Sequence, residues 1–451
     1  MLGLLLQYQS LKTVLLHTDA NTRFRISTHM PSIRDVEKVV PLKVSSLDIS
    51  RNCTTVVNGT EYKVGIFRHF PEGDVPSPVA RENNSRGSIF DFDEFGFPID
   101  AGNKVMLPGD VSFQLENRSE FRRDTEEIEG EYRDDLRRHE KALEMQAELK
   151  TKGITVEDYL KSLRPIVGDR FDRAFAEEAR RRYVLINSPK SISDCIEHFK
   201  LKLLPFDCRR NNTPPPFTCY IQLTITKRGS RQIQRFEYNK KLFEASKCLH
   251  EALFGSRKVP IQVERVDLSC FETIYRLPVG FRLHAKHVHT SLTNLTHASF
   301  LSLVENSERL ETVGIRFKMR TDALQSQIVR NARRIVIREG SVGVNEAIQD
   351  FPNLDITIEE LYSPADIFSL IRVWLSGDRP IGASCRIEME DDETAREVLR
   401  MVRTHYEMAK MTERCVTIDQ TNSTKVEVSY VPLTPPCYSK KWMLKARIVN
   451  A

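Results

Sequence analysis

A short apolar pattern that returns along the second half of the chain constrains the fold more than any other feature. Its spacing is apolar-x-x-apolar-x-apolar, and stretches typical of helices, such as 299–308 and 322–331, separate its copies. A strand and a helix returning every 19–25 residues cannot bury their apolar sides alone, so neighbouring units must stack. The copies are Val263, Val266, Leu268; a weaker Ala285, Val288, Thr290; Leu310, Val313, Ile315; Ala332, Ile335, Ile337; and Phe351, Leu354, Ile356.

This period predicts an α/β protein built as an irregular, leucine-rich-repeat-like array of strands and helices. It is irregular because the Asn that follows the strand in regular repeats is missing. We expect strands near 263–269, 310–316, 333–338 and 353–358 to be neighbours in one parallel sheet. An ordinary α/β domain with right-handed crossovers would give a similar period and remains the alternative.

The residues between the apolar positions of each strand are expected to share one outward face, because side chains alternate along a strand. That face is either a binding surface for a target polypeptide or a solvated strand face. The positions with polar side chains are Arg265, Asp267, His287, His289, Thr312 and Arg334.

A group of histidines lies in the same region, at positions 284, 287, 289 and 297. His287 and His289 would lie about 7 Å apart on one strand face, and neutral imidazoles there could ligate zinc. Neither a carboxylate nor a cysteine is in register with them, so histidines on an exposed face are the favoured interpretation. The sequence therefore predicts no metal site.

The first 117 residues divide into a helical and a strand-rich segment. Residues 4–40 have the spacing of short amphipathic helices, and Pro31 can begin a further helix at 32–38. Asn58-Gly59 between two strand-like runs predicts a tight hairpin, because both residues tolerate positive φ. The acidic and aromatic run 90–97 suggests an edge strand closing over the sheet, or alternatively a docking peptide for a basic groove.

Residues 118–182 break the composition of the chain. They hold 16 Lys/Arg and 17 Asp/Glu, so half of the segment is charged with almost no net charge. Only a thin apolar stripe remains, at Leu136, Leu143 and Leu149. This composition predicts an inserted, solvated helix pair that can be removed without unfolding the remainder.

Chemistry-bearing motifs are few. The sequence contains no GxxxxGK[ST], GxGxxG, GxSxG or HExxH motif, and it has nine cysteines without a CxxC pair. Glu390 to Glu393 precede a helix-like run, and Ser363-Pro364 with Asp366 is typical of a helix start. With a net charge of only +5 and no run of 18 apolar residues, we expect neither nucleic-acid nor membrane binding. We therefore predict a non-enzymatic protein without cofactor, soluble and intracellular, in cytoplasm or nucleus.

The amino-acid sequence near both ends of the chain resembles that of a known family. "LLQYQSLKTVLLHTDANTRFRISTHMPSIRDVEKVVPLKVSSLDI" with "VVNGTEYKVGIFR" is similar to the opening of the nematode F-box C proteins. "SPADIFSLIRVWLSGDRPIGASCRIEME" resembles the end of the F-box-associated domain. The resemblance implies a substrate adaptor of a cullin–RING ubiquitin ligase, whose amino-terminal helices dock on a Skp-type adaptor protein while the body holds an unknown target protein.

The docking residues that the resemblance implies are Leu6, Leu11, Val14, Leu15 and Ile26. The segment Leu6-Gln-Tyr-Gln9 lacks the usual proline, so these helices could instead be buried against the body in a plain interaction or structural protein. The expected organisation is F-box-like helices at 1–43, a β-rich segment at 44–117, a charged helical insert at 118–200, the repeat array at 201–376 and an F-box-associated region at 377–451.

Overall fold

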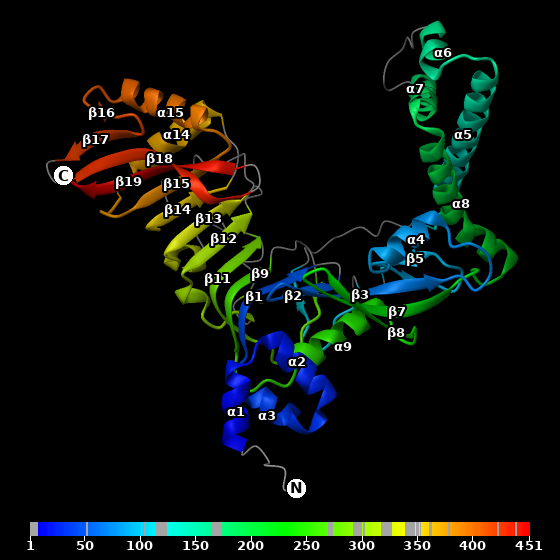
Figure 1. Cartoon of the computed structure of the whole chain (residues 1–451), viewed down its shortest axis with the longest axis horizontal. Coiled ribbons are helices and arrows are strands. Elements are labelled where there is room, and N and C mark those ends of the chain that lie inside the picture. Colours follow the sequence, from blue (N-terminus) through cyan, green and yellow to red (C-terminus); the bar gives the residue numbers. More distant parts are fainter. Residues whose placement is uncertain are drawn as a thin grey trace.

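A computed structural model gives the structure of the protein (Figure 1). It describes residues 8–50, 53–100, 102, 105–113, 124–163, 173–268, 274–291, 300, 303–316, 327–338, 348, 351, 353–359, 363–377, 379–421, 424–437 and 440–451.

In the described part of the chain, one mixed sheet of fifteen strands runs through the molecule. From one edge to the other its order is β16-β17-β18-β19-β15-β14-β13-β12-β11-β9-β1-β2-β3-β7-β8. The strands are β1 (Lys43–Ser50), β2 (Thr54–Val57), β3 (Thr60–His69), β7 (Thr218–Lys227), β8 (Ser230–Glu237), β9 (Ile261–Leu268), β11 (Leu283–Ser291), β12 (Thr312–Arg316), β13 (Arg334–Arg338), β14 (Asp355–Ile358), β15 (Ser384–Met389), β16 (Lys410–Met411), β17 (Cys415–Thr421), β18 (Thr424–Cys437) and β19 (Lys440–Asn450). The chain is thus an α/β protein, as predicted.

The centre of this sheet is parallel. β1, β9, β11, β12, β13, β14 and β15 pair with one another in that order, and every pairing is parallel. The predicted parallel pairing is therefore confirmed, with β11, the weaker copy of the pattern, between β9 and β12. β1 belongs to the same series although about 200 residues separate it from β9, and Val44, Leu47 and Ile49 give it the same apolar spacing.

The last copy of the apolar pattern lies two residues later in the structure than the sequence predicts. Leu354 is 40% exposed, whereas Ile356 and Ile358 are fully buried and pair with Ile335 and Ile337 of β13. Leu354 lies one residue before β14 begins, and the pairing register places Ile356 and Ile358, rather than Leu354, beside the core residues of β13. The unit is therefore Asn353, Ile356, Ile358.

Asparagines connect neighbouring units, although they precede the strands instead of following them. The Asn306 side chain accepts a hydrogen bond from the Ala285 amide at 2.9 Å and donates to the Ala285 carbonyl at 2.7 Å. Asn353 likewise donates to the carbonyls of Val329, at 2.8 Å, and Ala332. These amides satisfy backbone groups where one unit turns into the next.

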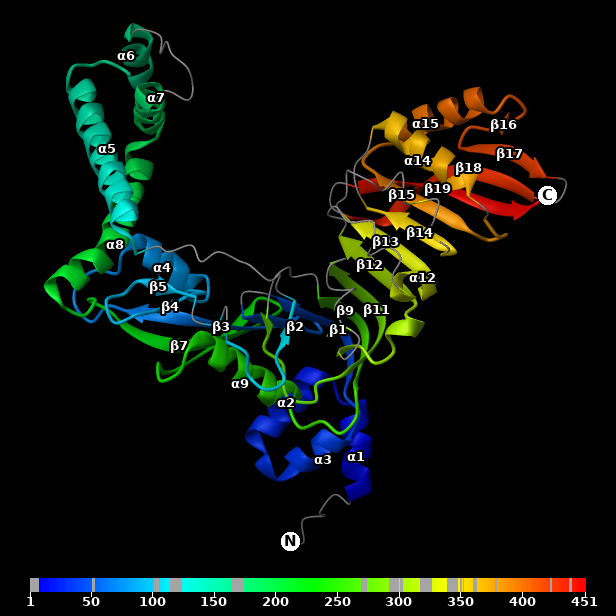
Figure 2. The ribbon, with the colours of Figure 1, turned by 180° about the vertical axis from the view of Figure 1, so that it is seen from behind.

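Helices cover the apolar side of the parallel region. α14 (Pro364–Ser376) and α15 (Asp392–His405) both pack there through the main hydrophobic core, which includes Trp374. Both lie on the same side of the sheet in the two views (Figures 1 and 2). The predicted helix starts are confirmed: Ser363 and Asp366 form a capping box, and Asp391 accepts a hydrogen bond from the Thr394 amide.

The predicted hairpin at Asn58-Gly59 is confirmed, with positive φ at both residues and β2 antiparallel to β3. The run 90–97 does not form an edge strand of the main sheet. Its β4 (Asp91–Phe92) pairs only with β5 (Pro98–Ile99). The reason is the Asp91 carboxylate, which accepts hydrogen bonds from the Leu242 amide at 2.9 Å and the Tyr238 hydroxyl at 2.7 Å and is thereby held at the start of α9 (Leu242–Phe254). A further short pair joins β6 (Val111–Ser112) and β10 (Ile274–Tyr275).

The charged insert forms an arm that projects from the body (Figures 1 and 2). Its helices are α5 (Glu126–Thr151), α6 (Val156–Ser162), α7 (Arg173–Ile186) and α8 (Pro189–Asn211). It is more than the expected pair, because a small core around Ala142, Val184, Leu185 and Ile192 holds it together. α8 also continues past residue 200, the expected end of the insert. Its last turns belong to the body, because Phe206 is buried there against Phe97.

At the amino terminus, α1 (Tyr8–His17), α2 (Ala20–His29), the 3-10 turn η1 (Pro31–Ile33) and α3 (Arg34–Val39) form a helical unit beneath the sheet (Figure 1). The remaining helical elements among the described residues are α4 (Ser77–Asn84), η2 (Ser307–Arg309) and α12 (Gln327–Asn331). In the part of the chain that the structure describes, no helix has the length and apolar character needed to cross a membrane.

Candidate interaction surfaces

The sheet register brings the predicted target-facing residues onto one side of the parallel strands. We call this side, from β1 to β15 and β19, the polar sheet face. Two rows of Cα partners run across it. The first row is Ser46, Arg265, His287, Thr312, Arg334, Asp355, Ser384 and Arg447. The second row is Asp48, Asp267, His289, Gly314, Val336, Thr357, Arg386 and Lys445.

The polar sheet face lies opposite the side on which α14 and α15 pack. Neighbours along β13 show the division: Ile335 and Ile337 belong to the main core, whereas Val336 is also buried but lies outside it. Of the predicted residues, Arg265 is exposed, Asp267, His287, His289 and Arg334 are half-buried, and Thr312 is buried. On this face the long polar side chains are thus at least partly accessible, whereas the short side chain of Thr312 is covered.

His289 and Gly314 form one feature of this face. They are direct partners on β11 and β12, and a Cβ at position 314 would overlap Nδ1 of His289. The imidazole thus occupies the space that a larger residue would need. Burial, followed by the nearby Arg338 guanidinium, lowers the pKa of His289 to about 4, so the ring is neutral at pH 7.

Beside this ring the polar sheet face is hollowed. The hollow has a volume of about 280 Å³, and Asp48, Arg265, Asp267, His289 and Arg338 supply its charged and titratable side chains. Its lining holds carboxylates as well as guanidinium groups, which suits a polar ligand group with both donors and acceptors. Four of these side chains come from the first three parallel strands: Asp48 from β1, Arg265 and Asp267 from β9, and His289 from β11.

The histidines do not assemble into a metal site. Within the described residues, no group of three or more His, Cys, Asp or Glu side chains is placed to hold a metal ion. His284 instead lies 3.1 Å from the carboxylate of Glu305, and His297 lies outside the described residues.

Ion pairs connect the strands toward the C-terminal half of the polar sheet face. Asp355 lies 3.3 Å from Arg334 and 3.4 Å from Arg386, and its carboxylate accepts a hydrogen bond of 2.7 Å from the Ser384 hydroxyl. Burial alone raises the pKa of Asp355, but the Ser384 hydrogen bond and the two guanidinium groups outweigh it, so the pKa lies below its usual value. One carboxylate is therefore shared by cations from both neighbouring strands.

The predicted docking residues of the amino-terminal helices divide between surface and interior. Val14 is 52% exposed, Leu11 and Ile26 are half-buried, and Leu6 lies outside the described residues. Leu15 is only 1% exposed, so it cannot belong to a docking face of the folded chain. The prediction was wrong for Leu15 because of helix geometry. Positions 14 and 15 differ by about 100° around α1, so Leu15 points into the interior while Val14 stays on the surface. Sequence reasoning missed Tyr8, which is 51% exposed on the same helix.

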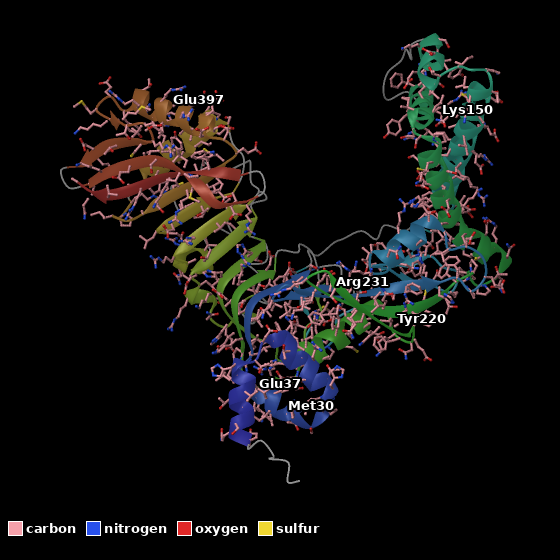
Figure 3. The ribbon with its side chains drawn as sticks, in the orientation of Figure 1. Met30, Glu37, Lys150, Tyr220, Arg231 and Glu397 are labelled. Atoms are coloured by element: carbon pink, nitrogen blue, oxygen red, sulfur yellow. The ribbon has the colours of Figure 1, made fainter. Side chains whose placement is uncertain are left out.

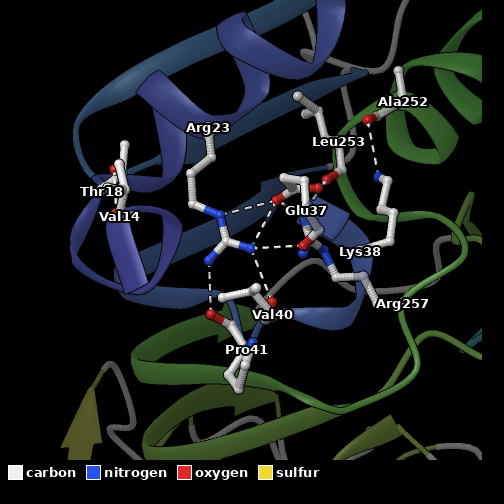
Figure 4. Close-up of polar contacts among 10 residues, drawn as sticks. All are labelled: Val14, Thr18, Arg23, Glu37, Lys38, Val40, Pro41, Ala252, Leu253 and Arg257. Carbon is white, nitrogen blue, oxygen red and sulfur yellow. Dashed lines mark hydrogen bonds and ion pairs between the residues drawn. The ribbon is translucent and has the colours of Figure 1, made fainter. Parts of the chain in front are cut away.

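Buried charges attach this helical unit to the body (Figure 4). Arg23 of α2 donates to Glu37 of α3 at 3.0 Å and to the carbonyls of Val40 and Pro41 at 2.8 and 2.7 Å. Arg257, which follows α9, donates to the same Glu37 carboxylate at 2.8 Å. Both arginines and Glu37 are almost completely buried, so removing the carboxylate would leave two uncompensated charges.

Comparison with known families adds one finding. A family model described as a domain of unknown function, DUF3557, matches residues 241–391, which run from α9 to the residue that caps α15. The match covers most of the parallel strands that carry the polar sheet face. Neither the curated proteins nor the solved structures contain a match to the chain.

Proposed function

We propose that the protein is the substrate-recognition adaptor of a Skp–cullin–F-box type ubiquitin ligase. In this proposal α1–α3 dock on the Skp-type adaptor protein, and an irregular leucine-rich-repeat-like array holds a target protein on the polar sheet face. Such an adaptor would act in the cytoplasm or nucleus.

The observation that carries the proposal is the uncovered side of the parallel strands. Parallel sheets in compact α/β domains are normally covered by helices on both faces. Here α14 and α15 lie on one side, and among the described elements no helix packs on the other. Stacked repeat units are the usual exception, and they use their open face to bind other proteins.

The surface of α1 supports the second half of the proposal. Tyr8 and Val14 are apolar, about half exposed, and lie on a helix at the outer end of the amino-terminal unit. Recognition of a helix by a partner groove depends on a few such anchors. The Leu6–Ile26 segment would thus contribute Leu11 and Val14 to the interface, with Tyr8 in addition.

The test is co-purification of the full chain with a Skp-type adaptor protein. Val14→Asp should reduce the retained adaptor at least tenfold, because a carboxylate at an anchor loses hydration or breaks the contact. Thr13→Asp is the matched control, since Thr13 is also exposed but lies about 100° away around α1. Both variants should melt at the wild-type temperature. A wild-type chain that never retains the adaptor would end the proposal.

A second candidate is an interaction protein that does not dock on a ligase. The Arg23–Glu37–Arg257 cluster favours it, because it fixes α2 and α3 to the body, and the burial of Leu15 withdraws one apolar side chain of α1 from the surface. It predicts that Val14→Asp changes neither adaptor retention nor target capture. The same pull-down therefore separates the two candidates.

A further inference from the structure

Strands β15 and β19 bring several cations together on the polar sheet face. Arg386 and Lys445 are direct partners in the antiparallel pair, and Arg447 lies two residues farther along the same side of β19. Like charges placed directly opposite one another destabilise a sheet. Burial lowers the pKa of Lys445, and the charges of Arg386 and Arg447 lower it further. Folding alone does not explain this pairing.

The carboxylates nearby do not balance these cations. Asp355 forms ion pairs with both Arg334 and Arg386. Glu427 lies on β18, the strand that pairs with the other edge of β19, and is the Cα partner of Arg447. Glu388 lies two residues beyond Arg386 on the same side of β15, so four cations on β13, β15 and β19 face three carboxylates. Arg447 is exposed, while Arg334, Arg386 and Lys445 are half-buried, so their charges remain accessible from the polar sheet face.

Resting on the proposed function, we infer that this cation cluster binds an acidic, extended segment of the target polypeptide. Neighbouring strands lie about 4.8 Å apart, so the cluster from β13 to β19 spans roughly 14 Å across three gaps. An extended peptide of four or five residues, at about 3.3 Å per residue, covers that distance. Its carboxylates would pair with Arg386 and Lys445 and relieve their mutual repulsion.

The interleaved carboxylates favour a peptide over a nucleic acid. Asp355, Glu388 and Glu427 would repel a backbone that carries a phosphate at every nucleotide, whereas a peptide can place neutral side chains opposite them. The excess of positive charge in the cluster is small, which matches a ligand with only a few carboxylates.

The experiment measures fluorescence anisotropy of a labelled peptide of alternating Glu and Ser, ten residues long, with the full chain. A Gln-Ser peptide of the same length and a ten-nucleotide single-stranded DNA are the comparison probes. We expect the Glu-Ser peptide to bind at least tenfold more tightly than either. Arg386→Gln with Lys445→Gln should weaken its binding at least tenfold.

The matched control is Arg400→Gln with Arg403→Gln. Both residues are exposed on α15, on the opposite side of the sheet, and this pair removes the same net charge. Equal weakening by both double variants would show attraction to net charge only and would overturn the inference, as would a DNA probe that binds as tightly as the acidic peptide.

Stability gives an independent readout. Lys445→Gln removes a charge that Arg386 opposes, so its melting temperature should equal or exceed that of the wild type. A decrease of several degrees would assign Lys445 to packing and contradict the inference. If the acidic peptide fails to bind while the Skp-type adaptor still co-purifies, the inference fails and the proposed function stands.

Discussion

Single residues determine how the polar sheet face is built. At Gly314 the backbone has ordinary φ, so the absence of a side chain matters because of the neighbouring ring and not because of the turn geometry. His289 lies over that position with Nδ1 buried and without a hydrogen-bond partner among the described residues. The ring is thus held by shape and packing, which makes its position sensitive to one added methyl group.

Gly314→Ala should lower the free energy of unfolding by about 1–3 kcal/mol, because the added methyl group displaces the imidazole. In a His289→Ala background the same change should cost far less, since the space is then free. Urea unfolding of the two single variants and the double variant gives the coupling energy.

Gly130→Ala is the control for this cycle. Gly130 lies in α5 with no atom near the position of a Cβ, and alanine is the better helix former, so this change should stabilise the protein. If Gly314→Ala costs the same with and without His289, the contact between ring and backbone does not control this site.

Among the elements, the arm is the most independent. α5 and α8 run side by side with ion pairs at matching levels, from Glu129–Arg210 at 2.5 Å near the body to Glu140–Lys200 at 3.6 Å farther out. Beyond Glu140 the arm is held by its own small core, which shares no residue with the other two hydrophobic clusters. The charged side of α5 extends to its outer end, where Lys150 is labelled in Figure 3.

Replacing residues 141–199 by a short Gly-Ser linker should therefore leave the body folded. The cut removes the whole arm core and joins Glu140 to Lys200 where the two helices already lie close together. Removing 118–182 instead would leave Val184, Leu185 and Ile192 without Ala142 and the other side chains of α5 and α6 that cover them. We expect the first deletion to melt within a few degrees of the wild type and the second to aggregate. Thermal unfolding followed by circular dichroism, with size-exclusion chromatography, measures both.

A large loss of melting temperature in the 141–199 deletion would contradict this prediction. It would mean that the outer arm stabilises the body, although none of its core residues packs there.

At the scale of the whole molecule, one sheet connects segments that are distant in sequence. β1 contacts β9 on one side and β2 on the other, so it joins the parallel strands to the antiparallel strands β2, β3, β7 and β8. At the other end β15 pairs with β19, which is nearly the last segment of the chain. The matched family region, 241–391, contains neither β1 nor β19.

A fragment of residues 241–391 should consequently aggregate, because it exposes unpaired edges at both β9 and β15. Extension to residue 451 restores the partner of β15, and co-expression with residues 1–113 should restore that of β9. Soluble yield and elution volume in size-exclusion chromatography report the outcome. A monomeric 241–391 fragment with a cooperative melt would show that these edges need no partner.

Local pattern alone determined several features of this protein. The apolar spacing predicted parallel strands, Asn58-Gly59 predicted the hairpin, and Ser363 with Asp366 predicted a helix start, all of which the structure has. These features depend on burial of alternating side chains and on hydrogen bonds within a few residues, so a short stretch of sequence carries the information.

Tertiary structure alone decided which residues meet. It placed β1 beside β9, Arg257 on Glu37, and Lys445 opposite Arg386, and it turned Leu15 inward while leaving Val14 on the surface. Periodicity says that a strand or helix has an apolar side, but it does not say which distant segment covers that side. Those pairings depend on packing and charge between segments up to about 220 residues apart, and only the folded chain brings them together.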